Sequence, residues 1–158
     1  MSVLRRSRAR CEDGKVTEIP VRCISPGEVE APLIVSLEPL SLWGGFSVTT
    51  GAVIERGHPA FGQILTGRIL AMPSGRGSSS SSSILAEALR LGTAPAGLVL
   101  AEADPIIAVG EIVARKLYGK SLPIVVCGLD ALERLQSGYT YRIFARNTGN
   151  AVLARILR

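Results

Sequence analysis

The apolar positions of the chain follow two alternating patterns, which together predict an α/β domain. Three continuous apolar segments are typical of strands buried on both faces: 63–72, 97–101 and 123–128. Two segments with apolar residues at helical spacing alternate with them: 84–91 and 106–118. Gly92 and Gly119 then stand where glycine ends a helix. The order strand, helix, strand, helix, strand calls for parallel strands with right-handed crossovers.

Further strands are predicted on both flanks of this βαβαβ core. Segments 32–38 and 51–55 precede it, and segments 140–146 and 151–157 form a β-hairpin around Asn147-Thr-Gly-Asn. Added antiparallel strands would make the sheet more curled than a plain doubly wound sheet. Residues 1–30 are polar and turn-rich, with only a hint of an edge strand at 16–21. We therefore expect an N-terminal extension over 1–30 and the domain over 31–158.

Composition narrows the class of protein. The 158 residues are 47% hydrophobic and 20% charged, enough for one compact domain. The net charge is +5, but the first ten residues hold four arginines and no acid, so the remainder is nearly neutral. Aromatic residues are 4% of the chain, and without a basic, aromatic face we expect no nucleic-acid partner. No apolar segment approaches the roughly 20 residues of a membrane span, and no secretory core follows the arginines, so we expect a cytoplasmic protein.

The three cysteines predict neither a disulfide framework nor a metal site. Cys11, Cys23 and Cys127 are far apart in the sequence and never form a Cys-x-x-Cys pair. We expect no metal ligands in this chain. If a metal acts in its chemistry, another chain should hold it.

The segment with the strongest chemical signal is Pro73-Ser-Gly-Arg-Gly-Ser-Ser-Ser-Ser-Ser-Ser, between a predicted strand and a predicted helix. A flexible linker is disfavoured because core-like segments flank it closely. A serine is expected to cap the helix, which does not explain six serines. Glycines and free amides at a helix N-terminus form a cradle for carboxylate or phosphate oxygens. A serine near Arg76 could act as a base, whereas Ser78 stands where a triphosphate-binding loop needs lysine.

Several blocks in order along 32–128 resemble the swivel domain, or small subunit, of aconitase X. The matching blocks are Gly51-Ala-Val-Ile, Gly57-His-Pro-Ala-Phe-Gly, Gly67-Arg-Ile-Leu-Ala-Met-Pro-Ser-Gly-Arg-Gly-Ser, Ala94-Pro-Ala-Gly-Leu-Val-Leu and Glu102-Ala-Asp-Pro-Ile-Ile. The resemblance implies a swivelling β/β/α barrel that closes over a large subunit. That partner would hold an iron–sulfur cluster, and the two chains would form a hydro-lyase. Known members dehydrate cis-3-hydroxy-L-proline or mevalonate 5-phosphate.

The same resemblance assigns roles within the serine-rich segment. In the wider aconitase family the swivel loop reads Gly-Ser-Ser-Arg-Glu, and its first serine, the proton acceptor, falls on Ser78. Ser79, Ser80 and the amides of Gly77 to Ser79 would bind substrate oxygens, and Arg76 would supply positive charge. The family's substrate-binding arginine falls on Ser80. This departure fits aconitase X and argues against a citrate-like tricarboxylate substrate, because a bidentate carboxylate clamp is missing.

Alternatives remain open at this stage. The scarcity of lysine in the chain, with three cysteines, is unlike hyperthermophile proteins and favours cis-3-hydroxy-L-proline over the archaeal substrate mevalonate 5-phosphate. A non-catalytic anion-binding regulatory module would use the same loop. His58, the single histidine, is interpreted as fixing a turn, with substrate contact or phosphotransfer as rivals. Asp104 before Pro105 predicts a helix cap, and Glu102 is left without a role.

Overall fold

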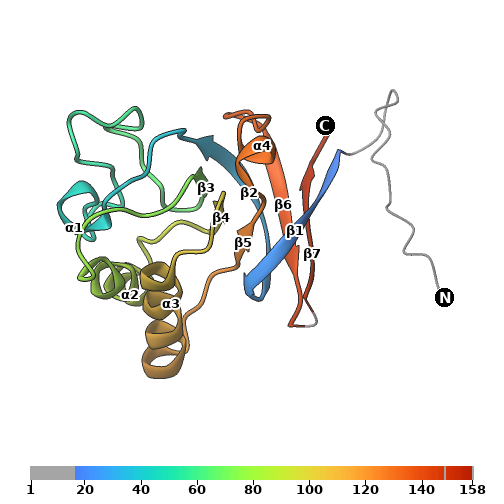
Figure 1. Ribbon diagram of the computed structural model, residues 1–158. Helices are drawn as coiled ribbons and strands as arrows, with labels where there is room; N and C mark the ends of the chain where they lie inside the picture. The colour runs from blue at the N-terminus through green and yellow to red at the C-terminus, as the bar shows by residue number, and fades with distance from the viewer. Residues whose placement is uncertain (1–16, 148, 158) are drawn as a thin grey trace.

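Seven strands close into a barrel in the computed structural model, which describes residues 17–147 and 149–157 (Figure 1). They are β1 (Glu18–Ser25), β2 (Gly27–Val35), β3 (Ile69–Met72), β4 (Gly97–Leu100), β5 (Ile124–Val126), β6 (Thr140–Ala145) and β7 (Asn150–Arg155). Four helices accompany them in the described residues: α1 (Leu42–Gly45), α2 (Ser81–Leu91), α3 (Pro105–Tyr118) and α4 (Leu129–Leu132). Around the barrel the strand order is β1-β5-β4-β3-β2-β6-β7, and β7 pairs again with β1.

The barrel has a parallel half and an antiparallel half. Strands β2, β3, β4 and β5 are neighbours and run parallel, whereas β6, β7 and β1 pair antiparallel. Helix α2 connects β3 to β4, and α3 connects β4 to β5. The two helices pack against each other outside the parallel half, and α3 also lies close to β1 (Figure 1). The predicted α/β fold, with a parallel βαβαβ core, an added hairpin and a barrel-like closure, is confirmed.

Two apolar cores explain why β3 and β4 read as continuous apolar runs. Side chains of a strand point alternately to its two faces. In β3, Ile69 and Ala71 belong to the cluster inside the barrel, whereas Leu70 and Met72 belong to the cluster under the helices. In β4, Val99 lies inside. Both faces of the parallel strands are thus covered, as expected for strands with crossover helices.

The barrel begins before the predicted domain boundary at residue 31. β1 and the first part of β2 lie within residues 18–30, the segment that the sequence analysis assigns to an extension. β1 pairs with β5 on one side and β7 on the other, so it closes the barrel. β1 and the first part of β2 are hard to predict from the sequence because only one face of each is buried. Charged residues such as Glu18, Arg22 and Glu28 alternate with the less exposed ones. Residues 1–16, with Cys11 and the four arginines, lie outside the described residues.

Two other predicted strands are shorter or absent. Segment 51–55 makes only isolated bridges, and β3 starts at Ile69 rather than at residue 63. Gly67, with φ of 72°, reverses the chain just before β3. Residues 36–68 therefore form a long excursion between β2 and β3, hereafter the β2–β3 excursion. It carries α1 and folds over the end of the barrel beside α2 (Figure 1).

Candidate functional site

Residues 73–80, hereafter the site loop, join the carboxyl end of β3 to the first turn of α2. The β2–β3 excursion follows β2 at the same edge of the sheet, and Asp104 follows β4. Ligands of α/β sheets bind preferentially at this edge, because loops from neighbouring parallel strands converge there. The topology thus gathers the glycine- and serine-rich segment and an acidic helix cap at one place.

A cavity of about 140 Å³ opens beside the site loop. Its walls come from the site loop, the start of α2 and α3, and the excursion: Leu42, Gly75, Arg76, Gly77, Ser78, Ser81, Asp104, Ile106 and Ile107. The structure therefore brings together three of the predicted site residues, Arg76, Gly77 and Ser78. Ser79 and Ser80 follow on the loop but do not line this cavity. Ser78 and Ser79 are exposed, so a ligand can reach both hydroxyls.

The backbone of the site loop leaves a run of amides available. The amides of Ser81 and Ser82 donate back to the carbonyls of Ser78 and Ser79, at 3.0 and 3.2 Å. The amides of Gly77, Ser78 and Ser79 have no acceptor in the part of the chain that the structure describes. Unpartnered amides before a helix favour a bound anion, so this geometry agrees with the predicted cradle.

Ser78 also accepts a hydrogen bond. The Ser80 amide donates to Ser78 Oγ at 3.1 Å, and a donor aimed at an oxygen favours its negatively charged form. Ser80 occupies the position of a helix cap, yet its side chain makes no capping hydrogen bond. The expectation named no particular serine, and at this turn it is Ser78 whose side chain accepts a backbone amide.

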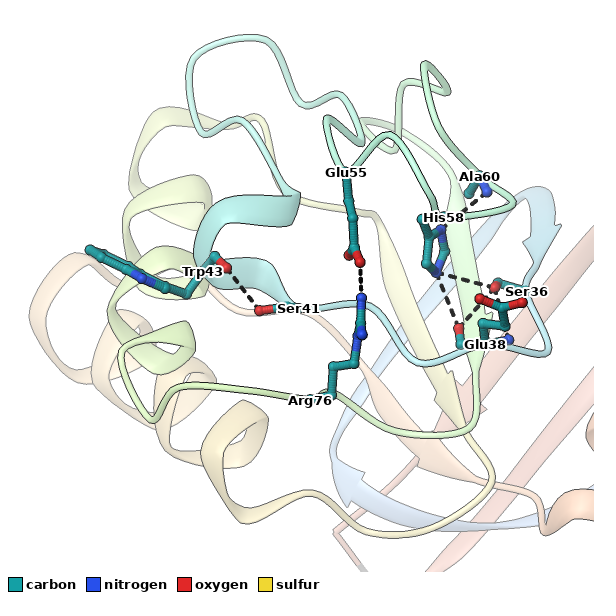
Figure 2. A network of polar contacts seen from close by, with 8 residues as sticks. All are labelled: Ser36, Glu38, Ser41, Trp43, Glu55, His58, Ala60 and Arg76. Atoms are coloured by element: carbon teal, nitrogen blue, oxygen red, sulfur yellow. Dashed lines mark hydrogen bonds and ion pairs between the residues drawn. The ribbon is translucent and has the colours of Figure 1, made fainter.

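The positive charge of Arg76 is compensated by a nearby carboxylate, which the sequence did not indicate. Its guanidinium forms an ion pair with Glu55, which the excursion places opposite the site loop (Figure 2). The Arg76 side chain is 50% exposed and that of Glu55 is 26% exposed. Sequence reasoning missed Glu55, since nothing around it in the segment 51–55 signals a partner for a residue 21 positions later. The pair leaves the cavity close to neutral on this side.

At two positions of the site loop, neighbouring side chains leave no room for a Cβ atom, so glycine is required. A Cβ at Gly75 would lie 2.7 Å from Asp104 Oδ2, and one at Gly77 would lie 2.9 Å from Ser41 Oγ. Gly77 also has φ of 84°, a conformation that side chains disfavour. The glycines therefore let the loop approach α3 and the excursion closely.

Asp104 caps α3, as predicted. Its Oδ1 accepts from the amides of Ile106 and Ile107 at 2.9 and 3.2 Å. Its Oδ2 accepts from the Gly75 amide at 2.8 Å, a contact the sequence did not indicate. Glu102 is exposed and lies outside the residues that line the cavity.

His58 is buried and holds a turn of the excursion (Figure 2). The Ala60 amide donates to Nδ1 at 3.1 Å, so the ring proton lies on Nε2. Nε2 then donates to the Glu38 carbonyl at 3.2 Å, with Ser36 Oγ at 3.3 Å. With both ring nitrogens engaged, His58 offers no free nucleophilic atom for phosphotransfer. Its contacts agree with the interpretation of a turn residue.

The described residues contain no group of three or more His, Cys, Asp or Glu side chains placed to hold a metal ion. Cys23 and Cys127 are free, half-buried thiols, and burial raises the pKa of both. An iron–sulfur cluster does not fit the side chains that this part of the chain presents. Separately, each of the described helices lacks the length or the apolar character needed to cross a membrane.

Comparison with known proteins assigns the family. The family model described as the aconitase X swivel domain matches residues 18–151. The chain is 45% identical over 107 residues to the cis-3-hydroxy-L-proline dehydratase of Pseudomonas aeruginosa, covering 68% of this chain and 18% of that enzyme. It is 46% identical over 95 residues to the phosphomevalonate dehydratase small subunit of Methanopyrus kandleri, covering 58% of this chain and 70% of that subunit.

Structural similarity agrees. The crystal structure of Thermococcus kodakaraensis aconitase X in its holo form superposes with a TM-score of 0.78 at 28% identity, covering 89% of this chain and 98% of that one. The chain spans less than a fifth of the bacterial dehydratase that it resembles and most of the archaeal small subunit. Its barrel, its serine-rich loop and these matches lead to one conclusion: the chain belongs to the aconitase X swivel domain family.

Proposed function

We propose that this chain is the swivel subunit of an aconitase X-type dehydratase and acts with a large subunit on a small hydroxylated carboxylate. The names of its relatives support the reaction class. The observation that carries the proposal is the exposed Ser78 hydroxyl on a cavity, next to three unpartnered amides. Because the described residues hold no metal ligand set, the iron–sulfur cluster is assigned to the large subunit.

In this proposal Ser78, as the alkoxide, removes the proton from the carbon next to the substrate carboxylate. The new bond is O–H on Ser78, and the electron pair of the C–H bond forms the double bond as the hydroxyl leaves. The amides of Gly77, Ser78 and Ser79 and the hydroxyls of Ser79 and Ser80 bind carboxylate oxygens, and the guanidinium of Arg76, paired with Glu55, lies on the same cavity. The Ser80 amide stabilises the charged Ser78 oxygen. A cluster in the partner would supply a Lewis acid for the leaving hydroxyl.

The charges around the cavity favour cis-3-hydroxy-L-proline as the substrate. Arg76 is the one basic side chain among the described residues that line the cavity, and Glu55 already neutralises it. Asp104 lines the cavity as well. A phosphate dianion is usually bound by unpaired arginine or lysine, whereas an imino acid carries one positive and one negative charge. Dehydration would give an enamine that tautomerises to Δ1-pyrroline-2-carboxylate.

Mevalonate 5-phosphate is the second candidate substrate. The relatives named phosphomevalonate dehydratase small subunit are short chains, and this chain covers 70% of one of them. The bacterial dehydratase is much longer than this chain, which covers 18% of it. In the phosphate reaction Ser78 would keep its role, and basic residues for the phosphate would have to come from the large subunit.

The test is turnover by the complex that copurifies, without air, with a tagged copy of this chain from its native cell. We expect consumption of cis-3-hydroxy-L-proline, and we expect Ser78→Ala to lower kcat by about 100-fold or more. Ser83→Ala is the matched control, because Ser83 is an exposed serine in the first turn of α2 and should leave turnover within about twofold of wild type.

Each other outcome identifies a different error. If Ser78→Ala retains turnover, Ser78 is not the base. If the complex consumes mevalonate 5-phosphate and not the imino acid, the substrate assignment is wrong while the dehydratase remains. If no iron–sulfur partner copurifies and the chain alone binds sulfate or phosphate, the chain is a non-catalytic anion-binding module.

A further inference from the structure

The two carboxylate oxygens of Asp104 bind two different elements. Oδ1 accepts the first free amides of α3, from Ile106 and Ile107. Oδ2 accepts the Gly75 amide of the site loop at 2.8 Å, across 29 residues of sequence. A helix cap needs only one oxygen, so the second contact is additional to capping.

The space around Gly75 shows that this contact is tightly fitted. A Cβ on Gly75 would come within 2.7 Å of Asp104 Oδ2 and 3.2 Å of Ile107 Cδ1. Ile107 is 1% exposed and belongs to the core beneath the helices. The site loop therefore lies directly against a buried part of α3 at Gly75, three positions before Ser78.

The other contacts of the loop are weaker or longer. The Arg76 amide donates to the Leu40 carbonyl at 3.3 Å, and the Arg76 side chain pairs with Glu55 where both are partly exposed. From Gly77 to Ser79 the amides have no acceptor within the described chain. A short hydrogen bond to a charged carboxylate is stronger than a neutral one, so the Gly75 contact is the firmest anchor on this side of Ser78.

We propose that Asp104 is a positioning residue: it holds the site loop on the N-terminus of α3 and thereby fixes the place of the Ser78 hydroxyl. This inference rests on the proposed function for its catalytic consequence. Its structural consequence, an anchored Gly75, does not depend on which reaction the complex performs.

The test separates anchoring from capping. Asp104→Ser keeps a good helix cap and removes the second oxygen, and Gly75→Ala leaves aspartate at the cap position while its new Cβ pushes Oδ2 away from the amide. Gly119→Ala is the matched control at the opposite end of α3. Gly119 has φ of 64° and open space around it, so alanine strains the helix end, lowers the melting temperature by about 3 °C and leaves the loop untouched.

Two readouts are measured, the first on the free full-length chain by NMR and the second on the complex. Amide hydrogen exchange at Gly75 should become about tenfold faster or more in Asp104→Ser, while exchange at Ile107 stays near the wild-type rate. In the complex, Asp104→Ser and Gly75→Ala should lower kcat about tenfold or more with KM within about threefold, whereas Gly119→Ala should match wild type.

Unchanged exchange at Gly75 in Asp104→Ser overturns the proposal, whatever the reaction. A kcat equal to that of Gly119→Ala overturns the positioning role while the dehydratase stands. If the wild-type complex has no dehydratase turnover, the proposed function fails, and the exchange measurement still decides whether Asp104 anchors the loop. If Asp104→Ser does not fold, the exchange rate of the amide at position 75 and kcat are measured in Gly75→Ala, and the same changes are expected.

Discussion

The crossing of α2 and α3 gives a prediction whose sign depends on two opposed effects. Gly110 lies inside α3, where glycine normally costs about 1 kcal/mol relative to alanine. At this position, however, a Cβ would lie 2.6 Å from the Ser82 carbonyl oxygen and 3.1 Å from Leu85 Cβ. Both neighbours belong to α2, and the closer one is backbone, so no side-chain rotation can relieve the contact.

The expected change in the free energy of unfolding follows from these distances. Ordinary contact begins at 3.4 Å, so the helices would have to separate by several tenths of an ångström where they pack. Overpacking costs about 1–3 kcal/mol, and a contact of 2.6 Å with backbone belongs to the upper part of that range, about 2–3 kcal/mol. Because the gain in helix propensity is about 1 kcal/mol, Gly110→Ala should lower the free energy of unfolding by about 1–2 kcal/mol. The shift also moves Ser82, in the first turn after the site loop, so kcat of the complex should fall as well.

Urea unfolding followed by circular dichroism measures the free energy change. Gly57→Ala is the control, because its Cβ would meet nothing within 4 Å and its φ lies outside the left-handed range. Alanine there should be neutral or stabilise the protein by about 0.5 kcal/mol. A Gly110→Ala variant as stable as wild type would show that the helices can part without cost, and the packing argument would then be wrong.

Three further predictions concern charges and thiols. The hydrogen bond from Arg90 lowers the pKa of Glu87, so NMR titration should find this carboxyl ionised to lower pH than an ordinary glutamate, and Arg90→Ala should remove the difference. Since that pKa is depressed, any stability from the pair is present at neutral pH and is lost as pH falls through it. Burial raises the pKa of Cys127, so peptide mapping after alkylation at pH 8 should show slow labelling that becomes fast in urea. Glu55→Gln should change the free energy of unfolding by less than about 1 kcal/mol, because its ion pair with Arg76 is partly exposed; a larger loss in urea unfolding would mean that the pair stabilises the whole fold.

The fold was predictable wherever burial involved both faces of a strand or one stripe of a helix. The segments around Val99 and Val125 are apolar without interruption because the barrel core and the helices cover their two sides. β1 and the first part of β2 were harder, since solvent covers one face of each and their charged residues resemble those of a loop. The excess length predicted for β3 has a related cause: Leu65 is fully buried, although it lies in an excursion and not in a strand.

The sequence allowed prediction only of those site residues that are contiguous along the chain. The glycines, the serines and Arg76 are contiguous, so the sequence displays them together. The partners of the loop are not contiguous with it. Glu55 precedes Arg76 by 21 residues, and Asp104 follows Gly75 by 29. The sequence indicated only that Asp104 caps a helix. The hydrogen bond between its second oxygen and the Gly75 amide depends on the tertiary fold and could not be predicted.

The defined shape of the site loop must therefore come from outside the loop. Its start is held by α3 through Asp104, and its end is held by the excursion, since the Trp43 amide donates to Ser81 Oγ at 3.2 Å. Ser41 in turn donates to the Trp43 carbonyl at 2.8 Å, which fixes that part of the excursion (Figure 2). The seven strands pair with one another around the barrel, and the site loop is shaped by contacts beyond this pairing. The excursion also supplies buried residues such as Leu40, Phe46 and Leu65 to the core under the helices, so the same segment that shapes the site loop also covers the outer face of the parallel strands, at whose carboxyl edge the cavity lies.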